Sequence, residues 1–243
     1  MLQLHWSPWA PMRRLCCRLR LLSTASVVTD KPQAAAADEP QLLWSHVKNI
    51  DATRCTDPLV RESDLRVMEE IITQEEETVV ADECIKILKR RRYEEDHWDQ
   101  VIVKFKEMER SRWSTETKRI LDRIREVPIV PQELNYFPAV HVIDLAEDGY
   151  IKPHVDSIKF SGQVVAGVSL LSPSIMRFKE EHGESLIDAF LPRRSLYMMT
   201  GRVRYHYTHE ILPGVQVFRN EFTVNRTRRI SIMLRDEFQD KQP

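Results

Sequence analysis

Residues 149–157 contain a histidine and an aspartate separated by a single residue, His154 and Asp156. Successive side chains of an extended strand point to opposite faces, so residues two apart lie on the same face. A histidine nitrogen and a carboxylate oxygen on one face can bind the same cation. Ordinary surface strands carry such pairs by chance, so His154 and Asp156 indicate a metal site only together with a further ligand.

A third candidate ligand is His209, which ends a segment that we expect to be a strand over residues 203–209. Two histidines and one carboxylate on one side of a metal form the facial triad of non-haem Fe(II) oxygenases. That triad leaves the other coordination positions open for a co-substrate and O₂. His154, Asp156 and His209 therefore predict a non-haem iron centre.

The C-terminal segment Arg229–Arg235 places an arginine at each end of one strand face, with Ser231 between them and only aliphatic residues on the opposite face. Such a strand is expected to be buried. A buried arginine needs an anion to balance its charge. A guanidinium group binds a carboxylate through two hydrogen bonds and stays charged when desolvated, so the pair suits a small dicarboxylate. The alternative is that both arginines lie at the strand ends and extend to water.

The first 29 residues are basic and contain no acidic residue. Serines and threonines follow the arginines, and several leucines share one possible helical face, a composition typical of a mitochondrial transit peptide. A secretory signal would need a continuous apolar segment, which the arginines interrupt. We therefore predict import into the mitochondrial matrix, with a disordered basic tail as the alternative. The arginines are Arg13, Arg14, Arg18 and Arg20.

Residues 30–61 carry a run of four alanines, scattered prolines and little periodicity, which predicts a disordered linker. The hydrophobic fraction of 42% is enough for a packed domain, which we place at residues 62–238. The net charge of the whole chain is −1, and removal of the basic leader would leave an acidic protein. This balance predicts no broad basic surface for nucleic acid.

Cysteine usage and hydropathy exclude two further classes. Cys16 and Cys17 would leave with the transit peptide, so only Cys55 and Cys84 remain, too few for a disulfide framework or a Cys-rich zinc site. A reducing compartment fits this composition. No apolar run approaches the roughly 20 residues of a membrane span, so none is predicted.

Two helices are expected before the β-rich part of the chain. Thr73 and Glu76 match a capping box, and Ser114 can cap the second helix. A short strand is expected at 65–72, and further short strands follow the helices. This pattern predicts a mainly β fold with flanking helices, a sandwich or barrel. The expected strands span residues 140–145, 150–156, 164–171, 174–178, 195–199, 203–209 and 229–235.

Three separated motifs carry a resemblance to a known family. They are His154-x-Asp156, the sequence LPRRSLYMMTGRVRYHYTHEI at residues 191–211, and Arg229–Arg235. In this order they closely resemble the AlkB family of Fe(II)/2-oxoglutarate dioxygenases, over residues 63–235. The resemblance implies a double-stranded β-helix (jelly-roll) core and an enzyme that uses Fe(II), 2-oxoglutarate and O₂.

The resemblance also implies residue roles. Iron would be held by the triad named above, and Arg229 would pair with the distal carboxylate of 2-oxoglutarate. Arg235 would lie nearer the keto-acid end, with Ser231 between the two arginines. Tyr197 would add a hydroxyl to the co-substrate, although a tyrosine on such a strand can equally be core packing.

The substrate is the least constrained expectation. Nucleic-acid-repairing AlkB enzymes carry an Asn-x-Tyr pair before His-x-Asp and a lid of aromatic and basic hairpins. Residues 140–145 lack that pair, and 113–139 are expected to hold only a helix and a proline-rich connection. We therefore predict a protein side chain as substrate. The alternatives are oxidative demethylation of alkylated RNA or DNA and a non-catalytic binding protein on the same fold. A local basic patch of Arg202, Arg204, Arg219, Arg226 and Arg228 would favour nucleic acid.

Overall fold

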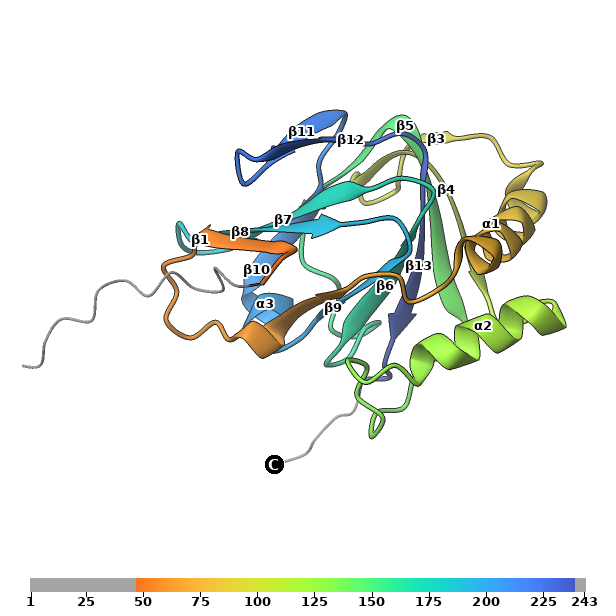
Figure 1. The fold of residues 1–243 in the computed structure, drawn as a ribbon, viewed down its shortest axis with the longest axis horizontal. Helices are drawn as coiled ribbons and strands as arrows, with labels where there is room; N and C mark the ends of the chain where they lie inside the picture. The colour runs from red at the N-terminus through yellow and green to blue at the C-terminus, as the bar shows by residue number, and fades with distance from the viewer. Residues whose placement is uncertain (1–46, 239–243) are drawn as a thin grey trace, which may run out of the picture. The chain divides into compact units, whose positions relative to one another are not determined.

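Strand pairing within residues 47–238, the part of the chain that the computed structural model describes, produces one large antiparallel sheet. Strand β5 (Val140–His154) is shared by two halves of this sheet (Figure 1). Its first part pairs with β13 (Arg229–Arg235), and its last residues pair with β10 (Tyr207–Ile211). The predicted transit peptide, residues 1–29, lies outside the described residues.

The two halves enclose a common core. Side chains from both halves, including Leu145, Tyr197 and Phe178, pack in one buried cluster. Two antiparallel halves packed on a shared interior form a jelly roll, so the predicted mainly β fold is confirmed. From β13 the first half continues through β6 (Val165–Leu170), β9 (Ser195–Met199) and β2 (Leu65–Met68), and from β10 the second continues through β7 (Ser174–Glu180), β8 (Leu186–Leu191) and β1 (Ile50–Arg54).

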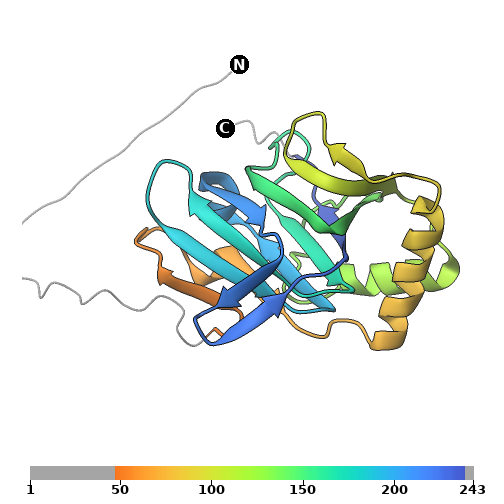
Figure 2. The same cartoon turned by 90° about the horizontal axis from the view of Figure 1, so that it is seen from above.

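Helices α1 (Gln74–Leu88) and α2 (Thr115–Arg125) lie on the outer face of the first half (Figure 2). Strand β13 illustrates how the first half of the sheet buries side chains on both of its faces. Ile230 and Ile232 pack in the cluster that includes the helices, whereas Arg229 and Ser231 face the interior. The alternation predicted for this strand is thereby confirmed. Among the described residues, no helix has the length and apolarity needed to cross a bilayer.

Both helices begin at the predicted caps. The Thr73 hydroxyl accepts a hydrogen bond from the Glu76 N–H (3.2 Å), and the Glu76 carboxylate accepts one from the Thr73 N–H (3.1 Å). The Ser114 hydroxyl accepts from the Thr117 N–H at 3.3 Å. Each cap satisfies N–H groups that have no partner inside the helix, which is why local sequence was enough to locate it.

The prediction of a disordered linker is wrong for residues 50–54. These residues form β1, which pairs antiparallel with β8 and buries Ile50 and Ala52. The apolar alternation of β1 is too short to be recognised without its partner strand. A 3₁₀ turn, Glu62–Asp64, then leads into β2.

Two predicted strand boundaries are also wrong. The segment expected as strand 203–209 is split into helix α3 (Gly201–His206) and β10, with Gly201 at a φ of +51°. The predicted strands 140–145 and 150–156 are instead the single strand β5, which ends at His154. Between the two predicted strands, a Cβ on Gly149 would lie 2.5 Å from the Lys104 carbonyl oxygen, so glycine lets β4 approach here.

A hairpin that the sequence analysis missed precedes the metal-ligand strand. It consists of β3 (Glu94–Asp96) and β4 (Ile102–Arg110), and β4 pairs along β5. The expectation for residues 113–139, a helix and a proline-rich connection, is unaffected, since helix α2 lies in that segment. Lys104 has a φ of +53° and interrupts the register, so Ile102 and Phe105, three positions apart, pack in the same interior cluster, whereas Met108 packs in the cluster with the helices.

A second hairpin, β11 (Val215–Phe218) and β12 (Phe222–Asn225), forms a separate two-stranded sheet. Phe218 and Val224 bury it against Ile175 and Leu212. This hairpin delivers Arg226, which follows β12 directly, into the protein interior.

Arg226 connects this region to β5. Its side chain is 2% exposed, and its guanidinium donates only to main-chain carbonyls. Because a guanidinium has five N–H donors, one side chain can tie several segments together. The acceptors are the carbonyls of Leu212 (3.2 Å), Ala146 (2.9 Å), Glu147 (3.1 Å), Thr227 (3.1 Å) and Gly149.

We expect Arg226→Leu to lower the free energy of unfolding by about 3 kcal/mol, because buried carbonyls lose their charged donor. Urea unfolding followed by circular dichroism measures this as a lower midpoint at unchanged slope. Arg112→Leu is the matched control, since Arg112 is exposed, and should change stability by no more than about 0.5 kcal/mol. Equal midpoints for the two variants would contradict the role assigned to Arg226.

Candidate metal centre

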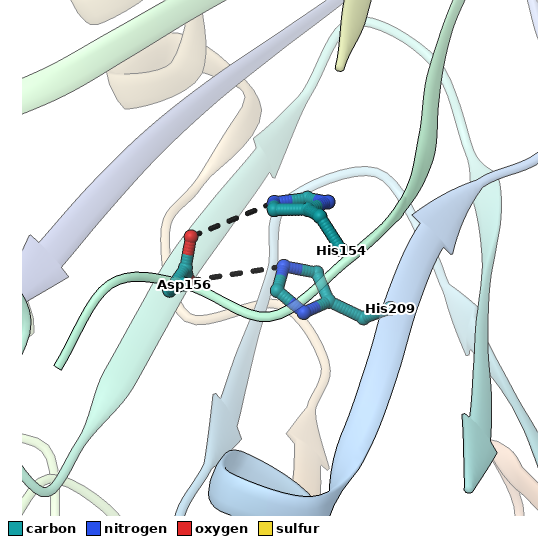
Figure 3. A group of neighbouring side chains, drawn as sticks. All are labelled: His154, Asp156 and His209. Atoms are coloured by element: carbon teal, nitrogen blue, oxygen red, sulfur yellow. Dashed lines mark ion pairs between the residues drawn. The ribbon is translucent and has the colours of Figure 1, made fainter. Parts of the chain in front are cut away.

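The three predicted metal ligands lie together. His154 ends β5 and is directly opposite His209 of β10 in the antiparallel register. Asp156 follows in the loop after β5 and points toward both imidazoles (Figure 3). Its Oδ1 lies 3.5 Å from His154 Nε2, and its Oδ2 lies 3.7 Å from His209 Nε2. One potential ligand atom from each residue falls within 4.8 Å of the other two, a spacing that one cation can bridge.

Asp156 lies where the sequence predicted, beside the histidines, but strand geometry is not what places it there. Since β5 stops at His154, strand alternation does not place the carboxylate. Instead Arg204 of α3, which is 1% exposed, donates to the Asp156 carbonyl (2.9 Å) and to the Ser161 carbonyl (2.8 Å). The sequence analysis assigned Arg204 only to a strand and to a basic patch. Arg204 is a functional residue that it missed, because carbonyl acceptors leave no signal in a sequence.

Asp156 carries a charge that the described residues do not fully satisfy. Burial would raise its pKa, but His209, His154 and Arg204 outweigh burial and lower it. Its Oδ2 is buried and accepts no hydrogen bond within residues 47–238. An ionised, inward-pointing carboxylate oxygen without a donor is a ligand atom suited to a cation.

The two histidines are suited to metal binding in different ways. Burial lowers the pKa of His209 to about 3, so its imidazole is neutral near pH 7 and has a free lone pair. Burial also opposes the charging of His154, but the hydrogen bond to Asp156 and its charge raise the pKa of His154. His154 Nδ1 lies 2.9 Å from the Lys152 carbonyl, which can only accept. A proton on Nδ1 therefore leaves Nε2 free for a metal.

Arg229 forms the buried end of the same cavity, which has a volume of about 420 Å³. The side chain is 1% exposed and its Nε donates to Ser169 Oγ at 3.0 Å. Its Nη2 is buried with no acceptor anywhere in the described part of the chain. Burial lowers the Arg229 pKa to about 10, so the group is charged at neutral pH. An unpaired buried guanidinium N–H fits a carboxylate ligand.

Tyr197 and Ser231 lie on the wall beside Arg229. Tyr197 is 3% exposed and faces Gly167 across the β6–β9 pair, where a Cβ on Gly167 would lie 2.5 Å from the Tyr197 ring. Glycine at this position thus makes room for the ring. Burial raises the Tyr197 pKa to about 12, so its hydroxyl keeps its proton and can donate.

Arg235 is at the opposite end of β13 and lines the cavity as well. Its side chain is partly exposed, and one Nη lies 3.6 Å from Glu109 Oε1. All the residues singled out from the sequence therefore line one cavity. Further lining residues come from the β3–β4 hairpin and its neighbours, and the sequence analysis gave them no role in the site: His97, Trp98, Glu107, His141 and Phe160.

The five arginines considered as a basic patch are not free on the surface. Arg204 and Arg226 are buried on main-chain carbonyls, and Arg219 donates to the carbonyls of Val47 and Ile50. Arg202 pairs with Asp57 and Glu180, and Arg228 pairs with Asp144. The expectation that these residues could form a basic patch beside the site is wrong.

Comparison with known proteins places the chain in a family. The family profile of the 2OG-Fe(II) oxygenase superfamily matches residues 64–235. This range contains the triad and both cavity arginines. The chain therefore belongs to the 2OG-Fe(II) oxygenase superfamily, and it is an Fe(II)- and 2-oxoglutarate-dependent dioxygenase. Fe(II), 2-oxoglutarate and O₂ are the cofactor and co-substrates of this class, and two histidines with one carboxylate fit Fe(II).

Two curated proteins give the more particular relationship. The chain is 46% identical over 165 residues to the mouse (Mus musculus) "Alpha-ketoglutarate-dependent dioxygenase alkB homolog 7, mitochondrial", covering 68% of this chain and 74% of the relative. It is 48% identical over 165 residues to the bovine (Bos taurus) protein of the same name, covering 67% and 73%. The AlkB resemblance is confirmed, and so is the prediction of an enzyme.

Among solved structures, a Trichoplax adhaerens prolyl hydroxylase in complex with a hypoxia inducible factor oxygen degradation domain peptide is similar in fold. The TM-score is 0.50 at 10% identity, with coverage of 72% of this chain and 84% of that chain. An identity this low supports the jelly-roll fold and nothing about substrate.

We expect Asp156→Ala to abolish saturable Co(II) binding, because it removes the only anionic group of the triad. Isothermal titration with Co(II), which replaces Fe(II) without oxidising in air, measures this directly. Asp148→Ala is the matched control, since the Asp148 side chain is 65% exposed on β5 and pairs with Lys104, and it should bind Co(II) as the unaltered protein does. Unchanged Co(II) affinity in Asp156→Ala would exclude the carboxylate as a ligand.

Proposed function

We propose that the enzyme hydroxylates a protein side chain in the mitochondrial matrix, with His154, Asp156 and His209 holding Fe(II). The buried Asp156 Oδ2, which accepts no hydrogen bond within residues 47–238, supports this ligand set. Bound Fe(II) would supply the O₂ chemistry of the family. Arg204 would keep Asp156 in position through its main-chain carbonyl, so that the carboxylate stays directed at the histidines.

The roles of the cavity residues toward 2-oxoglutarate follow from their depth. Arg229 would bind the distal carboxylate, because its free Nη2 is buried at the closed end. Ser231 lies beside it on β13, and the protonated Tyr197 hydroxyl would donate a further hydrogen bond. Arg235 would lie nearer the keto-acid end. The co-substrate would thus be oriented by strand residues on β13 and β9 and excluded from water at its distal end.

A protein substrate is favoured because the arginines around the site are already bound to carboxylates or main-chain carbonyls of the protein. Phosphate binding needs several cationic side chains free to exchange counterions for phosphates. Here Arg202, Arg219 and Arg228 are held by carboxylates or carbonyls, and the two buried arginines cannot reach solvent. A polypeptide needs no such surface.

One specific observation favours the second candidate, oxidative demethylation of alkylated RNA or DNA. The β3–β4 hairpin carries Trp98, which is 87% exposed and lines the cavity, and Phe160 lies nearby at 62% exposure. Exposed aromatic rings at the mouth of a cavity could stack on an extruded base. The same rings can also contact an amino-acid side chain.

Oxygen labelling should distinguish the two candidates. Mitochondrial extract incubated with the purified enzyme, Fe(II), 2-oxoglutarate and ¹⁸O₂ should yield ¹⁸O in a polypeptide side chain, detected by mass spectrometry, because one atom of O₂ enters the hydroxyl group. The Asp156→Ala variant is the control and should yield no label. Loss of methyl groups from an alkylated oligonucleotide, steeply dependent on salt and without labelled protein, would establish the demethylase instead.

The proposed location rests on the leader and on the relatives. The basic, acid-free residues 1–29 have the composition of a transit peptide, and the mouse and bovine relatives carry "mitochondrial" in their names. We expect a reporter fused to residues 1–40 to enter mitochondria, as seen by microscopy and protease protection. The matched fusion with all four leader arginines changed to glutamine should stay in the cytosol. A cytosolic location for the unaltered fusion would contradict the proposal.

A further inference from the structure

A second cavity extends outward from the one that contains the triad. It has a volume of about 510 Å³, and its lining includes Arg91, Met108 and Phe137, which the inner cavity lacks. The two cavities share part of their walls, so they are adjoining sections of one passage toward the metal ligands. The shared residues are Trp98, Glu107, His141, Phe160 and Arg235.

Two aromatic side chains border the shared section. Trp98 lies in the turn between β3 and β4, and Phe160 lies in the loop after β5. They are 87% and 62% exposed, and both line the two cavities, whereas exposed apolar side chains that gather at one place can mark a ligand or partner site. Lys159 Nζ already lies 5.7 Å from the centroid of the Phe160 ring, so a cation is accommodated on this ring.

Glu107 is a carboxylate built into the same section. One carboxylate oxygen lies 3.3 Å from Nε2 of His97, which is in the hairpin turn. The other lies 2.8 Å from Nε2 of His141, which is on β5. These contacts hold the side chain against the wall of the passage. The hydrogen bond with His141 also lowers the Glu107 pKa, which keeps the group ionised. Asp99, which lines only the inner cavity, adds a second carboxylate 2.6 Å from His97 Nδ1.

Three cations line the passage, and Lys159, beside Phe160, is not among the lining residues. Arg229 lines only the inner cavity, at its buried end, and Arg91 lines only the outer one, where it donates to the Glu107 carbonyl at 2.6 Å. Arg235 lies in the shared section but is next to Glu109. The aromatic rings are therefore accompanied by two carboxylates, Glu107 and Asp99, whose only ion-pair partners recorded in the described residues are histidines. Aromatic faces beside carboxylates favour a cation with an alkyl stem.

We infer that the substrate is a positively charged side chain, lysine or arginine in a polypeptide, whose alkyl part passes between Trp98 and Phe160 and whose charge is recognised by Glu107 and Asp99. This inference rests on the proposed protein hydroxylation. In the reaction a C–H bond of the side chain becomes C–OH with one atom of O₂. 2-Oxoglutarate is oxidised to succinate and CO₂, and the succinate carboxylate takes the other oxygen atom.

The test measures succinate formation by the full-length protein with Fe(II), O₂ and 2-oxoglutarate in the presence of peptide libraries. The libraries differ at one position. Two libraries hold a cation there, lysine or arginine, and three controls hold glutamine, norleucine or glutamate. We expect lysine or arginine libraries to stimulate succinate formation above the peptide-free rate and to gain one oxygen atom by mass spectrometry. The other libraries should leave the peptide-free rate unchanged.

Variants then test the recognition residues. Glu107→Gln should raise KM for the cationic peptides about tenfold, the loss of one charge-assisted contact, and change KM for 2-oxoglutarate less. Trp98→Ala should raise the same KM, and Trp98→Phe should restore it in part. Glu95→Gln is the matched control, because Glu95 is an exposed acid of β3 outside both cavities, and it should leave every parameter unchanged.

Each other outcome overturns the inference. Stimulation and hydroxylation of neutral or acidic peptides would leave protein hydroxylation standing and reject the cationic substrate. Failure of every peptide library, with stimulation by an oligonucleotide containing an alkylated base, would reject both. An unchanged KM in Glu107→Gln would remove the carboxylate from recognition, as would equal effects of Glu107→Gln and Glu95→Gln.

Discussion

The pairing of His154 with His209 is the constraint on which the rest of the site depends. The two residues lie opposite each other in the antiparallel β5–β10 register, with ring centroids 4.2 Å apart. Opposite residues of antiparallel strands point to the same face, so this register alone brings two imidazoles together. A slip of one residue would turn one ring to the other face. The hydrogen-bonded register between β5 and β10 thus determines whether the two histidines can share a metal ion.

Buried charges define the remainder of the cavity. Asp156 and Arg204 lie in contact through the main chain, and Arg229 lies at the closed end with an unused donor. A buried polar atom without a hydrogen-bond partner is costly, so its persistence indicates a ligand that completes it. The anionic oxygen suits a cation and the guanidinium suits a carboxylate. The family's Fe(II) and 2-oxoglutarate would each complete one of these two groups.

The sheet separates stability from function. Its outer face packs on α1 and α2 through aliphatic residues, whereas the inner face carries the polar residues of the cavity. The β3–β4 hairpin extends this cavity outward by pairing along β5, and so brings Trp98 and Glu107 to the passage that leads to the metal ligands. Trp98 and Glu107 thus lie on a hairpin apart from β5 and β10, which carry His154 and His209.

The sequence by itself determined the features that depend on local pattern. These are the caps at Thr73 and Ser114, the two faces of β13, and the residue types of the triad, because periodicity and capping act over a few neighbouring residues. Only the tertiary structure decided where Asp156 lies and that Arg204 and Arg226 are buried, because their partners are carbonyls of distant segments. It also decided the β3–β4 hairpin, since the bulge at Lys104 breaks the period of two by which a strand is recognised.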